Sequence, residues 1–270
     1  MATQARQEES YLRGLARASA GALIFGFPLL MTMEMWAFGA HMGRWRLATF
    51  VLVTAGVVYG LNRFAGFRDE TSPFDDLLDT ASALLVGFVV STALLALFGL
   101  IGPQTALREG IGMVAVQAAP ASMGAMLANK QLQQDRPSES KEDRAGYLGQ
   151  LFLMGAGALF LAFNVAPTEE MLLIGFRMGA WHAVALVLVS LAALHALVFT
   201  VGFAGQHESE GHLKAFARFT LAGYGLALLV SLYVLWTFGR LDGGMSEAVR
   251  SVVVLGFPAA IGAAIARLVV

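Results

Sequence analysis

Eight long apolar segments constrain this chain more than any other feature. They cover residues 18–40, 46–64, 77–101, 110–130, 147–167, 172–203, 215–238 and 248–268. About 20 apolar residues cross the ~30 Å hydrocarbon layer of a bilayer as one helix. Backbone polar groups inside lipid must be hydrogen-bonded, and isolated strands would leave them unpaired. The sequence therefore predicts an all-α membrane protein with eight transmembrane helices.

The composition and charge of the chain agree with this class. Hydrophobic residues make up 57% of the sequence and charged residues 14%, whereas a soluble domain carries roughly 25% charged residues. The net charge is −1, which provides no field that would attract nucleic acid. Because cysteine is absent, disulfides and thiolate metal sites are excluded. The expected partner is the lipid bilayer, not nucleic acid, and a homo-oligomer is left open.

The basic residues predict an orientation in the membrane. If the segments alternate in direction, twelve Lys and Arg fall on one side and six on the other. Cytoplasmic loops carry the excess of positive charge. A multi-pass membrane protein with both termini in the cytoplasm is therefore expected.

The two halves of the sequence resemble each other. A shift of 136 residues aligns 21–45 with 157–181 and gives eleven identities over these 25 positions, including a Thr, a Glu and a Trp. A shift of 138 aligns the Pro-Ala-x-x-Gly-Ala-x-x-Ala motif at Pro120 with the same motif at Pro258. Similarity at a fixed spacing is the signature of a repeat.

These matches predict two parallel four-helix repeats. The first would occupy residues 1–130 and the second 147–270, with a cytoplasmic linker over 131–146. Four spans are an even number, so both copies would enter the membrane from the same side. Parallel repeats of this kind are related by an axis along the membrane normal.

The pair Glu34 and Glu170 is the sharpest chemical signal in the repeat. A carboxylate inside an apolar span costs about 2.5–3.5 kcal/mol, and such residues usually face a cavity or a partner. Two facing carboxylates repel each other unless a cation or a shared proton lies between them. Thr32 and Thr168, two residues before each glutamate, could add the neutral oxygens that hard cations prefer. The pattern favours a cation site, with Glu34 and Glu170 as the metal ligands.

A structural interpretation of the same glutamates stays open. Glu34 lies in the outer quarter of its segment and Glu170 at or beyond the outer interface, where each could be solvated or form an ion pair with Arg44, Arg46 or Arg177. A helix break before each glutamate is a related expectation, because proline removes an amide donor and kinks a helix. The residues that suggest this break are Pro28 in the first repeat and Asn164 and Pro167 in the second.

Acidic residues at the start of the third segment have two interpretations. Ser72-Pro73 followed by Asp75 and Asp76 is typical of a helix start, with Ser as the N-cap and carboxylates near the positive end of the dipole. Asp79 lies deeper in the segment. Asp76 and Asp79 are also candidates for an inner mouth that guides cations.

Enzymatic function is not expected, because no zinc-protease, nucleophile-elbow or phosphate-loop motif occurs. An intramembrane enzyme that acts on lipid is a third hypothesis, without such a motif to support it. No organic cofactor is expected, and a bound divalent cation is left open.

The motif Gly-Phe-Pro-Leu-Leu-Met-Thr-Met-Glu-Met-Trp at 26–36, with Ala-Pro-Thr-Glu-Glu-Met at 166–171, resembles a bacterial family of uncharacterised integral membrane proteins. The resemblance implies a bacterial inner-membrane location and no particular activity. Two functions follow from the residues. The first is a channel or secondary transporter for an inorganic cation, with Ca²⁺ or H⁺ favoured. The second is a non-transporting sensor or assembly subunit whose glutamates are structural.

Overall fold

A computed structural model describes residues 2–64, 72–131, 146–200 and 216–269, and within these ranges the chain is helical with no strand. It divides into two compact units, Met1–Glu139 and Ser140–Val270. The predicted all-α class is confirmed for these residues. Residues 132–145, which hold most of the predicted linker, lie outside the described part.

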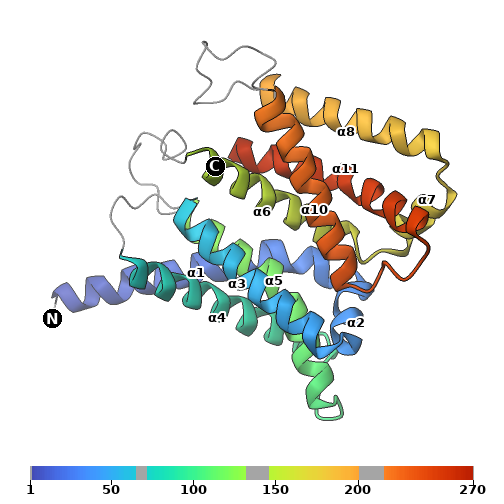
Figure 1. The fold of residues 1–270 in the computed structure, drawn as a ribbon. Helices are drawn as coiled ribbons and strands as arrows, with labels where there is room; N and C mark the ends of the chain where they lie inside the picture. Colours follow the sequence, from blue (N-terminus) through green and yellow to red (C-terminus); the bar gives the residue numbers. More distant parts are fainter. Residues whose placement is uncertain (1, 65–71, 132–145, 201–215, 270) are drawn as a thin grey trace. The chain divides into compact units, whose positions relative to one another are not determined.

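The helices of the first unit are α1 (Ala2–Leu30), α2 (Met33–His41), α3 (Arg44–Phe64), α4 (Pro73–Leu97) and α5 (Leu107–Gln131). Those of the second unit are α6 (Tyr147–Val165), α7 (Glu169–Arg177), α8 (Ala180–Thr200), the π-helical turn η2 (Phe216–Leu221), α10 (Ala222–Thr237) and α11 (Met245–Val269) (Figure 1). Each unit therefore has a short helix directly after its first long one.

Seven of the described helices are long and apolar enough to cross a membrane, namely α3, α4, α5, α6, α8, the continuous η2–α10 helix and α11. An eighth span is obtained if Leu12–Leu30 and Met33–His41 count together, although they are bent by 87° at the break between them. The polytopic membrane class is thus confirmed, and the described residues contain seven or, with the bent pair, eight candidate spans.

Two predicted segments prove to contain two helices each. Segment 18–40 covers the end of α1 and most of α2, and segment 172–203 covers most of α7 and all of α8. Hydropathy could not separate them, because an apolar run carries no information on the direction of the chain. The excess length of the sixth segment is explained by α7, which is separate from the spanning helix α8.

The start of α4 is built as the sequence predicts. Ser72 is the N-cap and its hydroxyl accepts a hydrogen bond from the Asp75 amide, while the Asp75 carboxylate accepts one from the Ser72 amide. Pro73 occupies the first helical position. This reciprocal arrangement is a capping box, which satisfies amides that have no partner within the helix.

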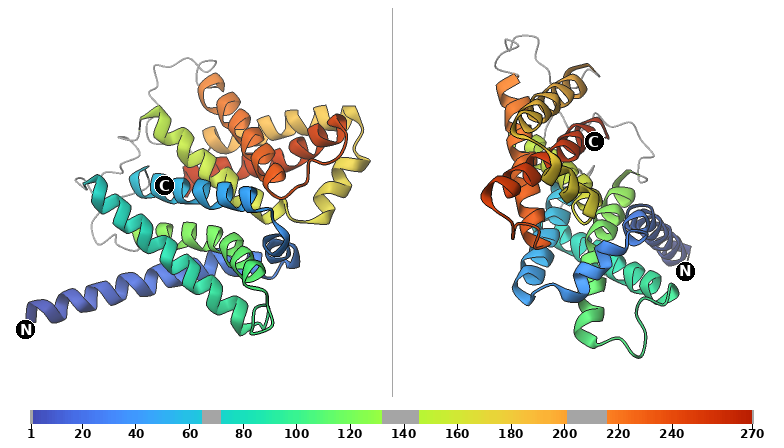
Figure 2. Two further views of the ribbon diagram at one scale, coloured as in Figure 1. Left: turned by 60° about the horizontal axis from the view of Figure 1, so that its bottom comes forward. Right: turned by 90° about the vertical axis from the view of Figure 1, so that its right-hand side faces the viewer.

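The last helix of each unit lies at its centre. In the first unit α5 packs against α1, α2, α3 and α4 (Figures 1 and 2). Its contact with α1 is made backbone to backbone, because a Cβ atom at Gly21 would overlap the carbonyl oxygen of Gly124 and the Cβ of Ala128. Small residues let membrane helices approach this closely.

The central helix of the second unit, α11, packs against α6, α7, α8 and α10. Here a Cβ atom at Gly157 would overlap the carbonyl oxygen of Gly262 and the Cβ of Ala266. The small residues of the Pro120 and Pro258 motifs therefore serve close helix packing, each within its own unit.

Candidate functional site

The first unit has a sharp elbow immediately before Glu34. Helix α1 ends at Leu30, and α2 begins at Met33 in a direction turned by 87°. The Thr32 hydroxyl donates a hydrogen bond of 2.8 Å to the carbonyl oxygen of Leu29, in the last turn of α1. Glu34 lies in the first turn of α2. The carboxylate therefore stands at the positive end of a short helix, where negative charge is stabilised.

The second unit has the same sequence of features. Helix α6 ends at Val165, and the Thr168 hydroxyl donates a hydrogen bond of 2.8 Å to the Val165 carbonyl oxygen. Glu169 and Glu170 follow in the first turn of α7. Each predicted Thr thus closes the end of the preceding helix, and a lone pair of its oxygen is still available to a ligand.

The residues expected to break these helices lie close to the elbows. Pro28 lies inside α1, two residues before its end. In the second unit Pro167 lies between α6 and α7. The side chain of Asn164 donates a hydrogen bond of 2.8 Å to the carbonyl oxygen of Phe160, within α6.

The two candidate glutamates differ in exposure, and neither forms an ion pair with another residue that the structure describes. Glu34 is half-buried and Glu170 is exposed. Within the described residues no basic side chain forms an ion pair with either of them, so the pairing considered with Arg44, Arg46 or Arg177 is not observed there. Because Glu34 belongs to one unit and Glu170 to the other, their meeting at one site stays a prediction.

The neighbouring carboxylate Glu169 is the one that pairs. Arg240, only 13% exposed, donates hydrogen bonds of 2.7 Å to Glu169 Oε1 and 2.8 Å to the carbonyl oxygen of Pro167. This guanidinium fastens the elbow of the second unit. Arg240 directly follows the dipeptide Phe238-Gly239, and in the first unit Leu100 directly follows Phe98-Gly99. Leu100 has no charge and packs with Trp36 against buried apolar side chains.

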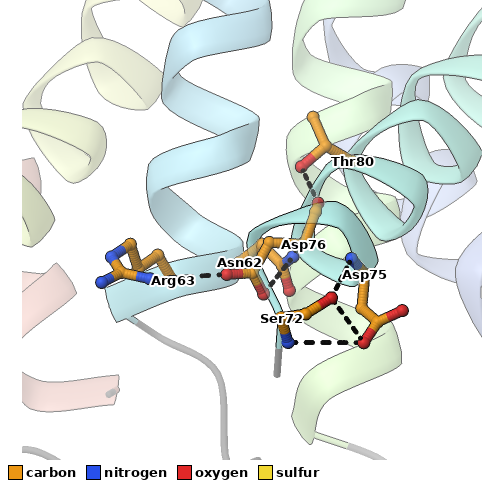
Figure 3. Close-up of polar contacts among 6 residues, drawn as sticks. All are labelled: Asn62, Arg63, Ser72, Asp75, Asp76 and Thr80. Atoms are coloured by element: carbon orange, nitrogen blue, oxygen red, sulfur yellow. Dashed lines mark hydrogen bonds and ion pairs between the residues drawn. The ribbon is translucent and has the colours of Figure 1, made fainter. Parts of the chain in front are cut away.

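Asp76 and Asp79, the candidates for an inner mouth, lie near the start of α4. Figure 3 shows Asp76 with its polar neighbours. The Asp76 side chain is 3% exposed and lies 3.6 Å from the Arg63 guanidinium. The buried Asn62 amide donates to Asp76 Oδ1 at 3.2 Å and to its backbone oxygen at 3.0 Å. These contacts connect the end of α3 to α4 and bury Asp76, whereas Asp79 is half-buried.

Two residues of these clusters, Asn62 and Arg240, were not anticipated. Each carries a weak sequence signal. Asn62 is an amide in the last turn of an apolar span, and Arg240 directly follows a Phe-Gly turn, and both polar side chains need partners there. The parts of the chain that the structure describes hold no group of three or more His, Asp or Glu that could bind a metal.

Comparison with known proteins gives one match. A family model described as "Putative integral membrane protein (DUF2391)" matches residues 14–270, nearly the whole chain. No curated protein and no solved structure matches.

Proposed function

Since the chain belongs to the DUF2391 family of integral membrane proteins, we propose that it is a channel or secondary transporter for an inorganic cation. The observation that carries this proposal is the elbow found in each unit, where a helix ends and a glutamate follows in the first turn of a short helix, with no ion pair to another described residue. Broken helices of this kind form ion and substrate sites in many transporters.

The proposal assigns specific roles to the residues at the elbows. Glu34 and Glu170 are the ligands or gates, and Thr32 and Thr168 supply neutral oxygens beside them. Two glutamate carboxylates, each with a threonine hydroxyl beside it, are all oxygen ligands, and Ca²⁺ prefers oxygen ligands. The same pair could share a proton, so H⁺ is the second candidate. The transported ion is the substrate, and no catalytic chemistry is assigned.

We also propose that the two units are copies of one four-helix ancestor, arranged as parallel repeats with both termini in the cytoplasm of a bacterial cell. The eleven identities between 21–45 and 157–181 support this. The structure adds equivalent contacts: the Gly21–Gly124 crossing in one unit and the Gly157–Gly262 crossing in the other. The loops after α4 and α10 also agree, with Gly99 at φ +70° and Gly239 at φ +68°.

A second candidate function is a non-transporting sensor or assembly subunit. It is favoured by the exposure of Glu170 and by the ion pair that Arg240 makes with the adjacent Glu169. The ion pair holds the short helix α7 in place, and an exposed Glu170 is solvated without a bound cation.

A flux assay with the purified full-length chain in proteoliposomes distinguishes the two functions. We expect a Ca²⁺-sensitive or pH-sensitive dye inside the vesicles to respond to an imposed gradient, with a rate that grows with the amount of protein. Vesicles without protein provide the background. Rates equal to that background for Ca²⁺, H⁺ and the other common inorganic cations would exclude transport and leave the second candidate.

A further inference from the structure

We propose that the first unit binds an anionic phospholipid at the end where α2, α3 and α5 meet. Arg44 and Arg108 would hold the phosphate, and an apolar groove beside them would take an acyl chain. This inference concerns the surface of the first unit and does not depend on ion transport.

The phosphate position is a hollow with a volume of about 280 Å³. Arg44 and Arg108 line it together with the apolar residues Met42, Leu47, Leu107 and Ile111. The two arginines are the first residue of α3 and the second of α5. Their positive charges therefore add to the positive ends of two helices, and both effects attract an anion.

These two arginines have no carboxylate partner among the described residues. Arg63 pairs with Asp76 and Arg240 pairs with Glu169, but no ion pair to Arg44 or Arg108 occurs there. The guanidinium of Arg44 lies 5.7 Å from the ring centre of Trp45. Two fixed cations beside an apolar surface fit a ligand that is anionic at one end.

An apolar groove of about 600 Å³ between α4 and α5 adjoins the hollow. Leu107 and Ile111 line both spaces. Along α4 the groove extends from Ala96 to Phe88, about 12 Å at the rise of an α-helix. Figure 2 shows α4 and α5 joined by a loop at this end.

The polar groups of the groove already have hydrogen-bond partners within the protein. Of its two threonines, Thr92 donates a hydrogen bond of 2.7 Å to the Phe88 carbonyl oxygen, and the Thr105 hydroxyl accepts one of 2.9 Å from the Gly102 amide. Their hydroxyls are thus already bonded within the protein. The remaining surface suits a hydrocarbon chain that is removed from water.

The position of Trp45 identifies the source of the phosphate. Its side chain is 76% exposed at the start of α3, and tryptophan is enriched at the membrane–water interface. A phosphate at Arg44 would therefore lie at headgroup level, with the groove leading into the hydrocarbon layer. This arrangement matches a phospholipid and not a free phosphate ion.

The second unit lacks both charges. Ala180 is the first residue of α8 and Ser246 the second of α11, at the positions that correspond to Arg44 and Arg108. The variant Arg44→Ala/Arg108→Ser therefore introduces residues that the other unit carries at the same places, and we expect it to fold.

Native mass spectrometry and thermal unfolding of the full chain in detergent test this site. We expect phosphatidylglycerol to be retained and to raise the unfolding temperature of the wild type, more strongly than phosphatidylcholine. In Arg44→Ala/Arg108→Ser the affinity should fall at least about tenfold, because the charge-assisted hydrogen bonds from the two guanidinium groups to the phosphate are lost. Inorganic phosphate alone should leave the unfolding temperature unchanged.

Arg177→Ala is the matched control, because Arg177 is an exposed arginine of α7 in the second unit. It should bind phosphatidylglycerol like the wild type. Equal retention of the two lipids by the wild type, equal affinity in the double variant, or a phosphate effect as large as the lipid effect would each overturn the assignment.

Discussion

Gly21→Leu and Gly157→Leu should each prevent the chain from folding stably in detergent. At both positions a single Cβ atom would already overlap a backbone carbonyl oxygen of the central helix, which cannot rotate away as a side chain can. Overpacking by one or two methylenes commonly costs about 1–3 kcal/mol. A leucine adds three further carbons, against a total stability of only about 5–15 kcal/mol for a typical domain.

The measurement is thermal unfolding together with the recovery of monodisperse protein. Gly56→Leu and Gly225→Leu are matched controls, because among the described residues a Cβ at either glycine meets no atom within 4 Å. We expect both controls to fold like the wild type. If Gly21→Leu or Gly157→Leu were as stable as these controls, the close crossings of α1 with α5 and of α6 with α11 would be wrong.

The second large effect is expected for Glu34→Gln/Glu170→Gln. Cation flux in proteoliposomes should fall at least about tenfold, towards that of protein-free vesicles, because a neutral amide has no charge to attract a cation. The fold should persist. Neither glutamate makes an ion pair among the described residues, so only its interaction with the helix dipole is lost, about 0.3–1 kcal/mol.

Glu109→Gln is the control for this experiment. Glu109 is an exposed glutamate in the first turn of α5, so the control removes the same charge from a comparable position. We expect flux near that of the wild type. If Glu34→Gln/Glu170→Gln transported cations as fast as the wild type, the proposed role of these carboxylates would be wrong, although the protein would still be a transporter.

The membrane class and the helices were accessible from the sequence because they depend on apolar length alone. Ser72, Pro73 and Asp75 likewise predicted the start of α4, since a capping box is made by residues close in sequence. Local and periodic patterns were therefore sufficient for most of the fold.

The elbows could be predicted only in part. Pro28 and Pro167 indicated a disturbance before each glutamate, but the bend of 87° and the separate helix α2 were not expected. Leu12–Leu30 and Met33–His41 together are long and apolar enough for one span, so hydropathy reads them as continuous. The direction of a short helix is set by its packing, and α2 packs on α5, more than 60 residues away in the chain.

The polar contacts at a distance could not be predicted from one sequence. Arg240 reaches the Pro167 carbonyl oxygen across 73 residues, and nothing near Arg240 in the sequence identifies that partner. Asp76 was singled out as a charge, but its burial depends on Asn62 at the end of the preceding helix. Such pairs are specified by how the helices pack against each other.

Cross-linking of the two elbows tests the central claim, that Glu34 and Glu170 meet at one site. The chain has no native cysteine, so Glu34→Cys/Glu170→Cys contains one defined thiol pair. Two glutamates that share a cation hold their Cα atoms farther apart than the roughly 7 Å that a disulfide allows, so a short bifunctional thiol reagent is the cross-linker. The account predicts an intramolecular cross-link in membranes, formed faster than in Glu34→Cys/Glu169→Cys. Two thiols that stay free and react independently with a membrane-impermeant maleimide would contradict it.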